Sequence, residues 1–170
     1  MTIRQIEDEE YDLWILISRV YHVIAKLRKV ELSKYSIAPT QSYILLIIKA
    51  LGNQTTPTEL SRYVYQERSS VSDILNRMEK QGLIVKTKKS GERKRVIVTI
   101  TEKGEESLRL SRNRECLHKV MSSMTDEERQ QLVSCLEILR DNAINELNIH
   151  EKQILPPSRI SEYYHKKGSL

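Results

Sequence analysis

The sequence of 170 residues contains no phenylalanine, a single tryptophan and only two cysteines, Cys116 and Cys135. Two cysteines are too few for a disulfide framework in a chain of this length, so we expect both thiols to be reduced. No uninterrupted apolar run approaches the roughly 20 residues that cross a bilayer, so no membrane span is predicted. Residues 1–10 are acidic and lack a signal-peptide pattern, which leads us to expect a cytoplasmic protein.

Patterns of catalytic and metal-binding residues are also missing. There is no nucleophile–base pair, no phosphate-cradling glycine loop and no metal-binding box, so we expect neither an enzyme nor a bound cofactor. The histidines His22, His118, His150 and His165 are scattered, and none of them forms a close pair at helical spacing. A metal site is therefore not expected.

The composition describes a soluble globular chain, with 39% apolar and 30% charged residues. The length suits one compact domain, or one domain with an oligomerisation element. The net charge of +5 fits a nucleic-acid ligand, an acidic partner or no specific partner. It distinguishes among these only when the basic residues are assigned to particular elements.

Helical periodicity dominates both ends of the chain. From Tyr11 to about Leu32, apolar residues recur at spacings of three and four, but Trp14 and Val23 lie outside that single stripe. A helix that is apolar on more than one side is either the central helix of a monomer or a helix shared with a second subunit. A second apolar seam follows Thr125, which is expected to cap a helix to about residue 148. The residues predicted to form a dimer interface are Leu13, Trp14, Ile17, Tyr21, Leu132, Leu136, Leu139 and Leu147.

Capping signals divide the centre of the chain. Thr40 is expected to cap a helix over 41–51. Thr56, Pro57 and Glu59 form a capping box that opens a short helix ending near Val64 or Tyr65. A second helix is expected over about 69–81, before the stop signal of Gly82.

A hairpin and another long helix follow. Segments 83–89 and 95–100 carry β-branched residues and are predicted to be strands, joined by a turn at Ser90-Gly91. Thr101 is expected to cap one long helix that reaches about Met124.

The order of short helix, turn, helix and hairpin predicts a winged helix-turn-helix, whose second helix can enter the major groove of DNA. The side of that helix opposite its apolar stripe carries short polar groups and arginines, which can hydrogen-bond to base edges and phosphates. These predicted DNA-binding residues are Arg68, Ser69, Ser70, Ser72, Asp73, Asn76 and Arg77.

The hairpin is strongly basic, with six cations among the ten residues 86–95. A solvated charged hairpin is the alternative to a DNA contact. Its place beside a helix that faces DNA favours contact with the DNA backbone or minor groove. The predicted contacts are Lys88, Lys89, Arg93, Lys94 and Arg95.

Residues 56–104 resemble the MarR family of bacterial and archaeal regulators. The stretches that carry the resemblance are TPTELSRYVYQERSSVSDILNRMEKQGLI, the wing KTKKSGERKRVIVTI and the helix start TEKG. The flanking helices follow the family's order, so the resemblance covers about 11–147. Matched by position, Ser69, Ser70, Ser72 and Arg77 correspond to recognition-helix residues that contact DNA. The family's wing pattern, Asp followed two residues later by Arg, is replaced here by Glu92 and Lys94.

The resemblance also implies a homodimer whose terminal helices interlock and present two winged domains to a pseudo-palindromic operator in double-stranded DNA. It further implies ligand or redox control in many members. Small anionic or aromatic effectors usually lodge between the helical body and the winged domain. Residues that could line such a crevice, although core and surface roles explain them equally well, are Tyr21, Arg28, Tyr35, Tyr43 and Tyr63.

A redox role would require the two cysteines to meet. Cys116 and Cys135 flank the break at Met124-Thr125, so they could lie at similar heights if the last two helices fold back on each other. The favoured alternative is that both are small buried apolar residues.

The predicted fold is therefore mainly α with a small β-hairpin wing. Residues 40–100 would form a winged helix-turn-helix DNA-binding domain, 11–35 and 101–149 a helical dimerisation region, and 150–170 a polar tail. The predicted function is that of a homodimeric, sequence-specific regulator, a repressor released by a small effector. The alternatives are a winged helix used for protein contacts in a larger assembly and a redox-responsive regulator.

Overall fold

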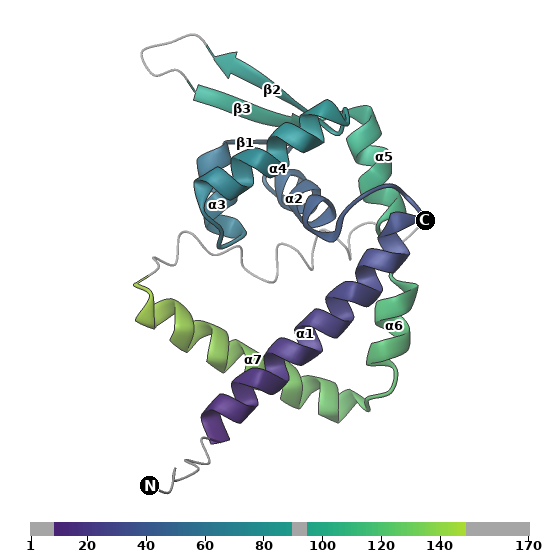
Figure 1. The fold of residues 1–170 in the computed structure, drawn as a ribbon, viewed down its shortest axis with the longest axis vertical. Coiled ribbons are helices and arrows are strands. Elements are labelled where there is room, and N and C mark those ends of the chain that lie inside the picture. The colour runs from purple at the N-terminus through teal and green to yellow at the C-terminus, as the bar shows by residue number, and fades with distance from the viewer. Residues whose placement is uncertain (1–8, 90–94, 149–170) are drawn as a thin grey trace, which may run out of the picture.

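The computed structural model describes residues 9–89 and 95–148, which form seven helices and three strands (Figure 1). In chain order these are α1 (Glu9–Ser33), α2 (Pro39–Ala50), β1 (Gln54–Thr55), α3 (Pro57–Tyr63), α4 (Arg68–Lys80), β2 (Ile84–Lys89), β3 (Arg95–Ile100), α5 (Glu102–Leu110), α6 (Glu115–Met121) and α7 (Asp126–Glu146). This order confirms the mainly helical fold with a small wing. The predicted turn at Ser90-Gly91 and the tail 150–170 lie outside the described residues. None of the described helices is long and apolar enough to cross a membrane.

The wing is a three-stranded antiparallel sheet in the order β1-β3-β2. The hairpin pairs Ile84 with Ile100 and Lys89 with Arg95, as the two predicted strands require. Strand β1 was not predicted, because a strand of two residues shows no periodicity. It pairs Gln54 with Thr99 and so holds the start of α3 against the sheet.

One hydrophobic core holds α2, α3, α4 and α5 against the sheet (Figure 1). Ile44, Ile47 and Ile48 of α2 are fully buried at its centre. Val71, Leu75 and Met78 of α4 pack into the same core, which confirms the predicted apolar stripe of this helix. Because this stripe faces inward, the opposite side of α4 must face solvent.

Helix starts follow the local capping signals, with one correction. At α3, Thr56 Oγ1 accepts from the Glu59 N–H at 3.2 Å while the Glu59 carboxylate accepts from the Thr56 N–H at 2.9 Å, as predicted. Thr125 and Glu128 repeat this arrangement at α7. The prediction that Thr40 caps α2 was wrong. This helix begins at Pro39, which fits a first helical position, and the Ala38 N–H donates to Gln41 Oε1.

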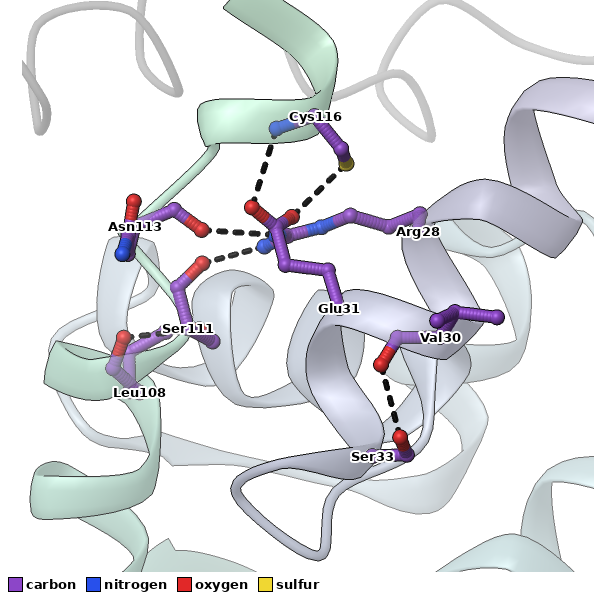
Figure 2. Close-up of polar contacts among 8 residues, drawn as sticks. All are labelled: Arg28, Val30, Glu31, Ser33, Leu108, Ser111, Asn113 and Cys116. Carbon is purple, nitrogen blue, oxygen red and sulfur yellow. Dashed lines mark hydrogen bonds and ion pairs between the residues drawn. The ribbon is translucent and has the colours of Figure 1, made fainter.

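The long helix expected from 102 to about 124 is broken, and this prediction was wrong. Helix α5 ends at Leu110 and α6 begins at Glu115. Figure 2 shows why the break is stable. The guanidinium of Arg28, on α1, donates to the carbonyl oxygens of Ser111 and Asn113, which a continuous helix would have used internally.

The outer helices α1 and α7 cross in the half of the molecule opposite the sheet (Figure 1). Of the 25 residues of α1, only Glu31 and Leu32 are buried, and of the 21 residues of α7 only Ile144 is buried. Helices α1 and α7 therefore carry apolar faces that the described part of this chain leaves uncovered.

Candidate nucleic-acid interface

Helix α4 presents its polar side to solvent. Arg68, Ser69 and Ser70 are exposed in its first turn, and Ser72, Asp73, Asn76 and Arg77 are exposed along its length. All seven belong to the face that was predicted to read DNA. The Arg77 Nε–H donates to the Asp73 carbonyl oxygen at 3.4 Å, which places this guanidinium along the helix. The prediction that these residues bind DNA stays a prediction.

Lys86 of β2 joins the wing to α4. Its ammonium donates to Asn76 Oδ1 and pairs with Glu79 Oε2 at 2.9 Å, and its backbone N–H donates to Glu79 Oε1 at 3.1 Å. The hydrogen bonds and the charge of Lys86 hold the pKa of Glu79 below its usual range. Lys86 therefore orients the Asn76 side-chain amide and fixes the sheet relative to α4.

A polar cavity of about 480 Å³ lies between the starts of α3 and α4 and the base of the wing. Three arginines line it, namely Arg62 from α3, Arg68 from α4 and Arg95 from β3, with the hydroxyl-bearing residues Thr56, Thr58 and Ser72. Arg62 was not among the predicted DNA-binding residues. Its basic side chain on α3 was a signal, but only the packing of α3 beside the wing brings it to Arg68 and Arg95.

One acid, Glu59, lines the same cavity. Its Oε2 accepts from the Thr55 and Thr56 hydroxyls and from the Thr56 N–H. Burial raises its pKa, but these hydrogen bonds and the nearby Arg95 charge outweigh burial and hold the pKa below its usual value. Glu59 is thus ionised at neutral pH, and its carboxylate accepts the hydrogen bonds that cap α3. Because three arginines line the cavity with this one acid, the cavity has an excess of positive charge.

The remaining wing predictions are placed only in part. Lys88 is exposed on β2, and Lys89 is the last residue of that strand. Arg93 and Lys94 lie outside the described residues. Lys88 and Arg95 are therefore the described wing cations for which exposure supports a DNA contact.

The five residues proposed to line an effector crevice are not gathered in one place. Tyr21 is exposed on α1, whereas Tyr35 and Tyr63 pack against the core. Arg28 is held at the α5–α6 break. A cavity of about 390 Å³ between α1 and α6 has a different lining, which is Leu27, Val30, Glu31, Lys34, Glu115, Cys116, Lys119 and Val120.

Both cysteines carry free thiols. Burial raises the pKa of Cys116, and so does the hydrogen bond from its Sγ to the Glu31 carboxylate at 2.8 Å. Since the thiolate is the nucleophile that reacts with oxidants, the raised pKa makes Cys116 poorly suited to rapid oxidation. Cys135 is exposed on α7, contrary to its expected burial.

The predicted dimer residues carry the uncovered apolar surface. Trp14 is 61% exposed and Tyr21 68%, while Leu136 and Leu139 are 45% and 44% exposed. An apolar groove of about 630 Å³ lies between α1 and α7. It is lined by Leu13, Trp14, Ile17, Leu136, Leu139 and Ala143, together with Glu10 and Arg140.

Comparison with known proteins adds to this geometry. Residues 35–95 match the model of the MarR family. The chain is 30% identical over 132 residues to the transcriptional repressor MprA of Escherichia coli strain K12, which covers 74% of this chain and 75% of that protein. The chain belongs to the MarR family. It is a DNA-binding transcriptional regulator, and members of this family are not enzymes.

Solved structures of transcriptional regulators share the fold. An organohalide-sensing transcriptional regulator, RdhR, in its 2,4-dichlorophenol-bound form is 29% identical, with a TM-score of 0.81 over 92% of this chain and 94% of that one. A mutant MarR from E. coli in complex with operator DNA has a TM-score of 0.72 at 20% identity, covering 79% of this chain and 98% of that one. The second likeness concerns the fold alone.

Proposed function

We propose that this MarR-family protein is a homodimeric repressor that reads a pseudo-palindromic operator with α4 and is released by a small effector. The observation that carries the proposal is the exposed polar face of α4 beside a cavity lined by Arg62, Arg68 and Arg95. Such a surface combines groups for base edges with cations for phosphates. The repressor role rests on the likeness to MprA.

The test of this function is selection of bound fragments from the source genome by the full-length protein. We expect enrichment of sites with two inverted half-sites about one helical turn apart, roughly 34–36 Å between centres. Enrichment without an inverted repeat would count against the dimeric reading, and no enrichment over bulk DNA would reject sequence-specific binding.

A second copy of this chain is the proposed cover for α1 and α7. Both helices carry large apolar side chains that the described part of their own chain leaves exposed. A two-fold interface uses the same surface on both subunits, so the apolar faces of two copies can be buried against each other. Monomeric soluble proteins rarely expose contiguous apolar patches of more than a few hundred Å².

Leu136→Glu is expected to dissociate the dimer, because it places a charge in the apolar α1–α7 groove, where Arg140 is already paired with Asp141 and burial of a further charge is costly. Sedimentation velocity at micromolar concentration should show a shift from dimer to monomer. Gln130→Glu, at an exposed position of α7, is the matched control and should remain dimeric. A monomeric wild-type protein would reject the proposed dimer.

Arg77→Ala is expected to weaken operator binding by about 1–3 kcal/mol, the usual contribution of a base-edge contact. Binding to unrelated duplex DNA should change little, because the lost contact carries sequence information. Fluorescence anisotropy with both duplexes measures the two effects. Arg109→Ala, which removes an exposed arginine of α5, is the control. Equal weakening on both duplexes would assign Arg77 to the phosphates instead.

The proposed effector is a small aromatic molecule that carries an acidic group. The α1–α6 cavity supports an aromatic molecule with apolar walls from Leu27, Val30 and Val120. Lys119 pairs with Glu115 at 2.7 Å, so Lys34 is the cation of the lining that we propose for the acidic group. The related regulator RdhR binds 2,4-dichlorophenol, which has this chemistry.

We expect 2,4-dichlorophenol to raise the thermal midpoint of the wild-type protein and to weaken its operator binding. Val120→Trp should abolish both responses, because the larger ring fills the cavity. Differential scanning fluorimetry and anisotropy provide the readouts. An undiminished response in Val120→Trp would place the effector site outside this cavity.

A further inference from the structure

The break between α5 and α6 is held from outside by two side chains of α1. Arg28 donates from Nη2 to the Ser111 carbonyl oxygen and from Nη1 to the Asn113 carbonyl oxygen at 2.9 Å. Glu31, one turn later, accepts from the Cys116 N–H at 3.1 Å and from its Sγ at 2.8 Å. Arg28 thus satisfies carbonyls after the end of α5, and Glu31 satisfies an amide at the start of α6 (Figure 2).

Arg28 and Glu31 also pair with each other. Their side chains are only 13% and 9% exposed, so the pair is largely shielded from solvent. Burial raises the pKa of Glu31, but the hydrogen bonds from Cys116 and Arg28 outweigh burial and hold the pKa below its usual value. The pair is therefore charged at neutral pH, and its contacts with Ser111, Asn113 and Cys116 hold α1 to the end of α5 and the start of α6.

On the other side of the break, α5 is fastened to the recognition helix. The Thr101 hydroxyl donates to the Gly82 carbonyl oxygen at 2.6 Å, and Lys103 Nζ donates to the Gln81 carbonyl oxygen at 2.7 Å. The Thr101 N–H donates to the Leu83 carbonyl oxygen at 3.1 Å. Residues 81–83 directly follow α4, so these hydrogen bonds join α4 and α5 into one unit. The segment 111–114 is the first place after α5 where the orientation of this unit relative to α6 and α7 can change.

We propose that the Arg28–Glu31 pair is the positioning element that sets the angle at the α5–α6 break and thereby the half-site spacing that the dimer selects. This inference rests on the proposed homodimeric function. Arg28 and Glu31 do not belong to the DNA-facing surface. They act through α5, because a rotation at the α5–α6 break moves α4 of one subunit relative to α4 of the other. The distance between these two helices determines which half-site spacing in the operator the dimer can bind.

The test compares Arg28→Lys and Glu31→Gln with the wild-type protein on operators whose half-site spacing is varied one base pair at a time. Lysine keeps the charge but cannot offer the planar fork that reaches two carbonyls. Glutamine keeps one acceptor oxygen and loses the charge. We expect the preference for the best spacing over its neighbours to fall by about 2- to 30-fold in each variant, the range seen for residues that couple distant sites.

Three further readouts separate this role from a merely structural one. Circular dichroism, dimer mass and affinity for unrelated duplex DNA should match those of the wild-type protein. Arg109→Gln breaks an exposed pair of the same three-residue spacing on α5 and should keep the wild-type spacing profile.

An unchanged spacing profile in both variants overturns the proposal, and so does equal weakening at every spacing. Should Glu31→Gln fail to fold, the more conservative Arg28→Lys decides alone. Failure of the proposed function is distinguishable, because the wild-type protein would then show no preference among operators at all.

Discussion

Replacing Gly104 by alanine is expected to lower the free energy of unfolding by about 3 kcal/mol or more, the upper range for overpacked sites. A Cβ at this position would lie 2.0 Å from the Leu83 carbonyl oxygen and 2.8 Å from Ile100 Cγ2. The nearer atom belongs to the backbone and accepts from the Thr101 N–H, so it cannot withdraw without breaking the fastening of α5 to the end of α4. The substitution should loosen the junction between the end of α4 and the start of α5.

Gly52→Ala is the matched control, because Gly52 is constrained for a different reason. A Cβ there would meet nothing within 4 Å, but the φ of +84° lies in the left-handed region. This substitution should cost about 1–2 kcal/mol from backbone strain alone. Urea unfolding followed by circular dichroism measures both variants. A loss at Gly104 no larger than the loss at Gly52 would contradict the close approach of α5 to Leu83.

The features that the sequence predicts well are those with local causes. Thr56 and Glu59 are three residues apart, so their capping box can be recognised without knowledge of the fold. The apolar stripe of α4 follows from its spacing alone, and with it the exposed side that carries Ser69 and Arg77.

The features that the sequence does not predict depend on distant partners. The helix break at 111–114 is stabilised by Arg28, which lies 85 positions before Asn113. Local propensity around Ser111 gives no sign of this contact, and the pattern favoured one long helix. Likewise, Arg62 joins Arg68 and Arg95 only through the packing of α3 beside the wing.

Removing the three arginines of the α3–α4–wing cavity, by Arg62→Ala, Arg68→Ala and Arg95→Ala together, is expected to weaken binding to every duplex. Each lost phosphate contact should reduce the slope of log affinity against log salt by about 0.9, hence by roughly 2–3 per protomer. At about 0.1 M salt this corresponds to a loss of at least a hundredfold. Anisotropy titrations over a salt series, with operator and unrelated DNA, provide the measurement.

A control variant that loses three cations elsewhere separates the loss of phosphate contacts from the change in net charge. Lys29, Arg109 and Lys119 are exposed and lie on α1, α5 and α6, away from the recognition helix. Their joint replacement by alanine should leave the slope nearly unchanged, because screening suppresses charges beyond about 10 Å at 0.1 M salt. Equal slopes for the two triple variants would mean that the arginine cavity does not contact phosphates. A normal slope for the cavity variant, combined with loss of operator preference, would instead assign its arginines to the bases.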